Sequence, residues 1–139
     1  MKKKISICLQ FILILICLNG CGIIHQGKKE QHKLDFTVLA PEDIPIQCET
    51  RIEKEKKANF GFTFSDEQYL YICVGYGEQK TSGYSIRVNE LYTDGSEIYV
   101  GTSLIGPKSL EETKVINTYP YVAIKTEYIE QNVIFDSWH

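Results

Sequence analysis

Alternation between apolar and polar positions predicts β-strands along most of the chain after residue 59. Phenylalanine occupies every second position of residues 60–64 (FGFTF), which is the pattern of a strand with one buried face. Residues 69–75 (YLYICVG) are apolar or aromatic on both faces, as expected for a central strand. Further strands are predicted at residues 34–39, 84–92, 97–104, 121–127 and 133–135.

One tetrapeptide between two of these strands predicts a tight hairpin. Residues 93–96 read TDGS, and Asp-Gly supplies the positive φ angles that such turns need. We therefore expect residues 84–92 and 97–104 to pair as adjacent antiparallel strands.

A different period precedes the strands and predicts one amphipathic helix. Ile44, Cys48 and Ile52 recur every four residues, while charged residues occupy the other faces up to residue 57. Asn59 is the expected C-terminal stop of this helix. The fold class is therefore α+β and mostly β: an antiparallel sheet or small sandwich of five to seven strands with one N-terminal amphipathic helix.

The first 20 residues have the pattern of a secretory signal peptide. Three lysines follow Met1, and the apolar run at residues 5–18 is about 21 Å long as a helix, well short of the roughly 30 Å of a bilayer core. The run ends in Leu18-Asn19-Gly20-Cys21, which resembles the bacterial lipobox. This resemblance implies that Cys21 is diacylated, becomes the new N-terminus and anchors the chain to the extracytoplasmic side of a membrane. The alternative is an ordinary cleaved signal peptide.

The predicted organisation is a signal peptide at residues 1–20, a lipidated tether at 21–33 and one β-rich domain at 34–139. The chain has 15 Lys and Arg against 18 Asp and Glu, and three of the lysines lie in the leader, so the mature net charge is −6. An acidic surface does not neutralise phosphates. We therefore expect no nucleic-acid partner.

The positions of the histidines and of the acidic residues argue against an enzyme. The three histidines, His25, His32 and His139, lie in the predicted tether and at the C-terminus, so the domain offers no imidazole base or zinc ligand. Carboxylates are scattered without a spacing that selects a pair. We expect no catalytic residues, no metal and no cofactor.

Only two cysteines, Cys48 and Cys73, remain in the domain once the leader is removed and Cys21 is lipidated. A disulfide between them is possible outside the cytoplasm. The alternative is that both are small core residues, one on the helix's apolar stripe and one in a strand.

Two segments, separated by the predicted hairpin, carry a family resemblance. They are residues 77–86 (GEQKTSGYSI) and 118–125 (TYPYVAIK). Together they resemble the C-terminal domain family of the protease complex subunit PrcB, with the resemblance extending over residues 69–126. The named member of that family is a surface lipoprotein that accompanies a secreted subtilisin-like protease. The resemblance implies an accessory role and binding to an extracellular or envelope protein, such as a protease.

The same segments contain the candidate binding residues. Glycines bracket a polar loop that can bend tightly between strands, and tyrosines are common at interfaces. The candidates are Gly77, Glu78, Lys80, Thr81, Ser82, Gly83, Tyr84, Tyr119, Pro120 and Tyr121.

Other interpretations of these segments stay open at the level of sequence. The glycines also suit a plain hairpin loop, and an aromatic residue before proline favours a cis peptide at Tyr119-Pro120. The loop also resembles the binding loop of chagasin-type, immunoglobulin-like inhibitors of cysteine proteases, so an inhibitor module is one alternative. A binder of cell-wall glycan or another small ligand, with tyrosines stacking on sugar rings, is another.

Overall fold

The computed structural model describes residues 29–109, 111 and 113–138. The predictions for the signal peptide and for Cys21 lie outside the described residues. Within them, no helix is long and apolar enough to span a bilayer.

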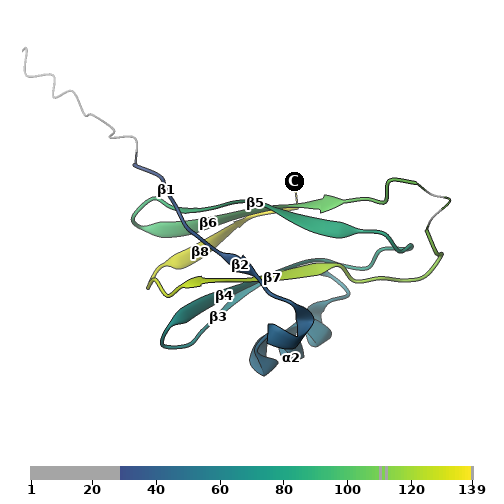
Figure 1. Cartoon of the computed structure of the whole chain (residues 1–139), viewed down its shortest axis with the longest axis horizontal. Helices are drawn as coiled ribbons and strands as arrows, with labels where there is room; N and C mark the ends of the chain where they lie inside the picture. Colours follow the sequence, from purple (N-terminus) through teal and green to yellow (C-terminus); the bar gives the residue numbers. More distant parts are fainter. Residues whose placement is uncertain (1–28, 110, 112, 139) are drawn as a thin grey trace, which may run out of the picture.

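The described chain forms a sandwich of two four-stranded sheets with one α-helix on the outside of one sheet (Figure 1). One sheet has the order β1-β5-β6-β8 and the other β2-β7-β4-β3. The strands are β1 (His32–Lys33), β2 (Thr37–Val38), β3 (Asn59–Ser65), β4 (Tyr69–Tyr76), β5 (Ser85–Thr93), β6 (Glu97–Ile105), β7 (Tyr121–Glu127) and β8 (Asn132–Asp136). The predicted class, mostly β with one amphipathic helix, is confirmed. The strand count reaches eight because β1 and β2, of two residues each, add to six longer strands.

Strand pairing is antiparallel except at one edge. The hairpin predicted at residues 93–96 joins β5 to β6, and Gly95 has a φ of 87°. The Asp94 side chain accepts hydrogen bonds from the amides of Ser96 and Glu97, which fixes the turn. The exception is β8, which pairs parallel to β6, because the chain crosses from one sheet to the other after β7.

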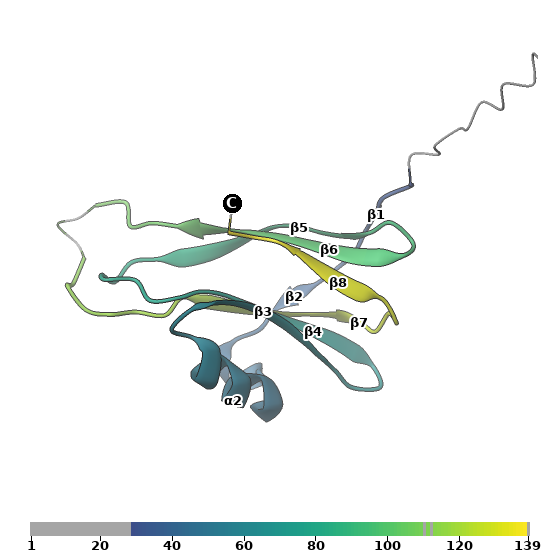
Figure 2. The same ribbon diagram turned by 180° about the vertical axis from the view of Figure 1, so that it is seen from behind.

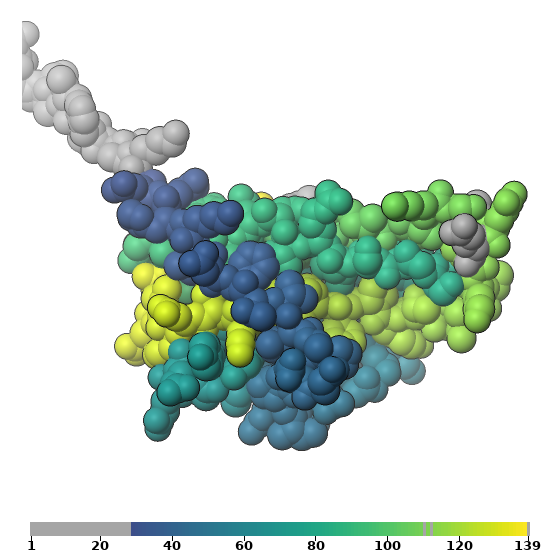
Figure 3. Space-filling model, in the orientation of Figure 1, coloured from purple at the N-terminus to yellow at the C-terminus, as the bar shows by residue number. Residues whose placement is uncertain are grey.

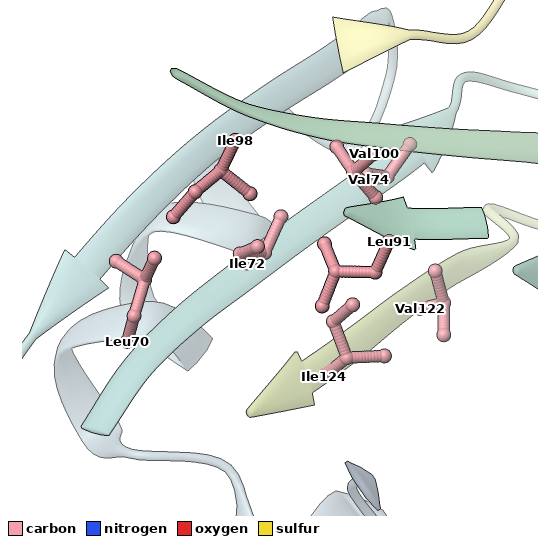
Figure 4. Packing of buried hydrophobic residues seen from close by; sticks show 8 residues of the cluster. All are labelled: Leu70, Ile72, Val74, Leu91, Ile98, Val100, Val122 and Ile124. Atoms are coloured by element: carbon pink, nitrogen blue, oxygen red, sulfur yellow. The ribbon is translucent and has the colours of Figure 1, made fainter. Parts of the chain in front are cut away.

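The main core fills the space between the two sheets. Side chains of β4 and β7 meet those of β5 and β6, and all of them are buried (Figure 4). The members are Leu70, Ile72, Val74, Leu91, Ile98, Val100, Val122 and Ile124. Alternate residues of β4 point into this core, and the residues between them, such as Cys73, face the other side of the sheet, which is also covered. Both faces of β4 are therefore buried, and this explains why the pattern at residues 69–75 is apolar on both faces.

The helix α2 (Ile46–Glu55) lies on the outer face of the β2-β7-β4-β3 sheet (Figure 2). A second, smaller cluster fills the space between this helix and the sheet. Cys48 and Ile52 of α2 pack there against Phe60, Phe62, Cys73 and Ala123. A 3₁₀ helix, η2 (Pro41–Asp43), precedes α2, so the α-helix begins two residues after the first predicted apolar position, Ile44. Asn59 starts β3 instead of ending the helix.

The residues expected to form a free tether make contact with the domain from Lys29 onwards. Lys29 forms an ion pair with Asp94 at 2.9 Å, and His32 pairs with Thr93 in the sheet. His32 is therefore exposed on a strand of the fold and does not lie outside it. Through the contacts of Lys29 and His32, the described chain starts beside the β5–β6 hairpin.

Candidate functional site

The loop at residues 77–84 connects β4 of one sheet to β5 of the other, so it is not the hairpin loop of the plainer interpretation. Gly77 has a φ of 68° and Gly83 a φ of 93°, a region that side chains with a Cβ rarely adopt. A Cβ on Gly83 would also lie 2.8 Å from Cβ of Pro107. Both bracketing glycines are therefore required by the path of the loop.

Hydrogen bonds hold this loop against the segment that precedes β7. Gln79 and Thr118 exchange backbone hydrogen bonds of 2.8 and 2.9 Å as an isolated bridge. The Thr118 hydroxyl donates to the Thr81 carbonyl at 2.7 Å. On the far side, the Ser82 amide donates to the Lys114 carbonyl at 3.0 Å, and the Lys114 amide donates to the Ser82 hydroxyl at 2.9 Å. The two segments thus form one connected structure.

We call residues 77–84 and 114–119 the end-loop surface, because both segments lie at the same end of the sandwich. Figure 3 shows the teal atoms of the first loop beside the green atoms of the second at the right-hand end. Sequence reasoning found the first segment and Tyr119, but its candidate residues did not include Lys114 or Thr118, although Thr118 lies in the second segment that it singled out. It also missed Val115 and Ile116, which are 93% and 56% exposed. Two neighbouring exposed aliphatic residues in a polar loop were the available signal.

Charged groups meet at the α2 side of the end-loop surface. Glu78 forms an ion pair with Lys80 and accepts a hydrogen bond from the Tyr119 hydroxyl at 3.2 Å. The Lys80 ammonium and the Tyr119 hydroxyl hold the pKa of the Glu78 carboxyl below its usual range, and Glu78 raises the pKa of Lys80. At neutral pH both groups are charged, so they form an ion pair on a largely polar surface.

The end of α2 supports the same region. The Lys56 ammonium lies 5.2 Å from the centre of the Tyr119 ring, and the Lys57 carbonyl accepts a hydrogen bond from the Glu78 amide at 3.3 Å. A Cβ on Gly77 would lie 3.3 Å from that same Lys57 carbonyl oxygen. The position of Glu78 and Tyr119 therefore depends on where the helix ends.

The structure separates the three residues of the Tyr-Pro-Tyr motif. The described residues contain no cis peptide bond, so the expectation of a cis Tyr119-Pro120 bond is wrong. The Pro120 carbonyl instead accepts from the Tyr76 amide at 3.1 Å and extends the β4–β7 ladder, for which a trans bond suffices. Tyr121 starts β7 on the face that α2 covers. Its pKa is raised by desolvation and by the carboxylates of Glu53 and Glu49.

Tyr84 lies at the margin of the end-loop surface, half-buried where β5 begins. Its ring approaches Gly106, where an added Cβ would lie 3.8 Å from Cε1 of Tyr84. Of the ten candidate residues, the structure therefore brings together five: Glu78, Lys80, Thr81, Ser82 and Tyr119. It puts Tyr84 beside the β6 end and Tyr121 beside the helix.

The chemistry of the end-loop surface is that of recognition by hydrogen bonds, one ion pair and exposed apolar side chains. In residues 29–109, 111 and 113–138 no group of three or more His, Cys, Asp or Glu side chains is arranged to hold a metal ion. The other two candidates, Cys48 and Cys73, lie elsewhere: both are free and buried under α2.

A search of the curated proteins and of the solved structures found no match to this chain. One family model does match, and it covers residues 70–127. The matched segment runs from β4 to β7 and includes both parts of the end-loop surface. It coincides closely with the extent of the resemblance seen in the sequence. The family is described as PrcB C-terminal, and this chain is similar to it from β4 to β7.

Proposed function

We propose that this chain is a non-catalytic accessory lipoprotein, anchored by Cys21 on the extracytoplasmic side of a membrane, whose end-loop surface binds a protein partner such as a secreted protease. The match of residues 70–127 to the PrcB C-terminal family, whose description suggests a protease-complex-associated domain, supports the accessory role. The leader and the lipobox-like residues 18–21 support the anchor.

The observation that carries the proposal is the internal bonding of the end-loop surface. Five backbone or side-chain hydrogen bonds join Gln79, Thr81 and Ser82 to Lys114 and Thr118. Loops that are already ordered before binding lose less conformational entropy when a partner binds. A surface held in this way, which includes the exposed apolar pair Val115 and Ile116, is suited to protein recognition.

The direction in which β5 runs supports the proposal that the end-loop surface faces away from the membrane. Lys29 and β1 contact the domain at the β5–β6 hairpin, whereas the end-loop surface adjoins the first residue of β5. At about 3.3 Å per residue, the nine residues of β5 separate these two ends by about 30 Å. An anchor attached before Lys29 therefore leaves the end-loop surface accessible to a partner in the extracytoplasmic space.

The test is recovery of a partner from intact cells. The full chain is crosslinked mildly in its own membrane, extracted and compared with a Thr81→Ala, Tyr84→Ala double variant. The matched control is Tyr128→Ala, which removes a tyrosine that is 45% exposed next to the other end of β7. We expect one specific extracytoplasmic protein with the wild type and the control, and its loss with the double variant.

A second measurement on the recovered partner separates accessory from inhibitory action. If the partner is a protease, its turnover of a peptide substrate is preserved or raised by an accessory subunit, whereas an inhibitor module blocks it. Equal recovery with all three forms, or none with any, would overturn the assignment of the end-loop surface. Binding to purified cell wall without a protein partner would favour a glycan binder instead.

A further inference from the structure

Two thiols that are far apart in the sequence face each other beneath α2. Cys48 lies on the helix, Cys73 lies in β4, and each has 0% of its surface exposed. Both belong to the outer cluster with Ile52, Phe60 and Phe62. Besides the larger effect of burial, each thiol shifts the pKa of the other, so the two side chains lie close together within this cluster.

We propose that Cys48 and Cys73 form a disulfide bond that fastens α2 to the β2-β7-β4-β3 sheet. The sequence could not show that the two cysteines are close in space, and their shared position in the cluster between α2 and β4 now does. The two cysteines are also the only free ones among the described residues, so within that part of the chain they have no competing thiol. The proposal does not depend on the identity of any binding partner.

The bond forms by exchange with a small disulfide, such as glutathione disulfide. One cysteine thiolate attacks a sulfur of the oxidant, giving a mixed disulfide and releasing one glutathione thiolate. The second cysteine then attacks the mixed disulfide and releases the other glutathione. The protein loses two thiol protons and two electrons, and the oxidant becomes two thiols.

The surroundings determine when this exchange takes place. Burial raises the pKa of both thiols, most strongly that of Cys73, and the thiolate is the reactive form. Exchange in the closed native structure is therefore slow. The bond is made while the chain folds or while α2 is detached, and once made it is shielded from reductants by the same packing.

The crosslink would also stabilise the α2 side of the end-loop surface. Cys48 lies two turns before Lys56, whose ammonium covers the Tyr119 ring, and Lys57 accepts the hydrogen bond from Glu78. A helix held by a covalent bond keeps these supports in position when α2 would otherwise open.

The experiment is a peptide map of the full chain. The protein is extracted from membranes, unfolded, and refolded with glutathione disulfide and glutathione. Remaining thiols are then blocked under denaturing conditions before digestion with trypsin. Cleavage after Lys33, Arg51, Lys57 and Lys80 isolates Cys48 in residues 34–51 and Cys73 in residues 58–80, each as the only cysteine of its peptide. We expect these two peptides to be recovered as one linked species, which separates after reduction.

Thermal unfolding gives the second readout. The oxidised wild type should unfold roughly 10 °C above the reduced form, because the crosslink restricts the unfolded chain. A Cys48→Ala, Cys73→Ala double variant should unfold at the same temperature with and without reductant. Full blocking of both cysteines after oxidative refolding, with no linked species, would overturn the proposal. So would a reductant-dependent shift of the same size in the double variant.

Discussion

At the scale of single residues, three glycines adopt positive φ for different reasons. Gly95 has open space around it, so its conformation alone matters, whereas a Cβ added at Gly83 would also collide with Pro107. The Asp94-Gly95 turn was predictable because its signal is local. The role of Gly83 was not, because the contact with Pro107 comes from a distant part of the chain.

This difference gives a matched pair of substitutions. Gly95→Ala places a Cβ at positive φ and should cost about 1 kcal/mol of unfolding free energy. Gly83→Ala adds the contact at 2.8 Å with Pro107, and we expect about 1–3 kcal/mol more. Urea unfolding measures both. Equal midpoints for the two variants would show that Pro107 does not restrict the loop.

Asp94 provides a prediction of pH dependence. The Lys29 ammonium and the amides of Glu97 and Ser96 hold the pKa of its carboxyl well below its usual range. A carboxyl with a lowered pKa in the folded state stabilises the fold above its unfolded pKa of about 4, and that stability is lost as the pH falls further.

We therefore expect the wild type to lose stability more steeply between about pH 5 and pH 2 than Asp94→Asn, measured by urea midpoints at each pH. Glu67→Gln, which changes an exposed carboxyl in the β3–β4 turn, is the control and should keep the wild-type slope. Parallel curves for wild type and Asp94→Asn would contradict the role of the Asp94 carboxylate.

At the scale of elements, α2 shows how a local period leads to a correct prediction. The spacing of four residues predicted that Cys48 and Ile52 lie on the buried face of the helix, and both are buried in the structure. Element ends were less predictable, because Asn59 pairs with Tyr76 in the sheet instead of ending the helix. Pairing partners lie far away along the chain and leave no mark on a local pattern.

The two faces of α2 make a second matched pair. Ile52 is 2% exposed against the sheet, and Ile46 is 65% exposed on the same helix. Ile52→Ala should lower the unfolding free energy by about 3 kcal/mol through lost burial and a cavity. Ile46→Ala should change it by less than about 0.5 kcal/mol. A cost for Ile46→Ala equal to that of Ile52→Ala would contradict the packing described for α2.

The edge strand β8 shows more clearly what a local sequence pattern cannot predict. Residues 133–135 were predicted as a strand, but nothing local indicated that they would cross to the other sheet and pair parallel to β6. The segment between β6 and β7 has no periodic pattern at all, and it contains Lys114, Val115, Ile116 and Thr118. Those parts of the end-loop surface were therefore missed.

At the scale of the whole molecule, the sandwich places two features at opposite ends of its length. One end receives the chain from its N-terminal side through Lys29 and β1, and the other presents the end-loop surface (Figure 1). The sheets between them are held by a continuous apolar core. The separation follows from strand direction, since β5 starts at one end and finishes at the other. The central claim is that only the end-loop surface meets the protein partner.

Site-specific photocrosslinking in living cells tests this claim most directly. A benzophenone amino acid replaces Ile116 in one form of the full chain and Tyr128 in another; these positions are 56% and 45% exposed and lie towards opposite ends of β7. We expect one defined adduct with an extracytoplasmic protein from position 116 and none from position 128. The same adduct from both positions, or an adduct from position 128 alone, would contradict it.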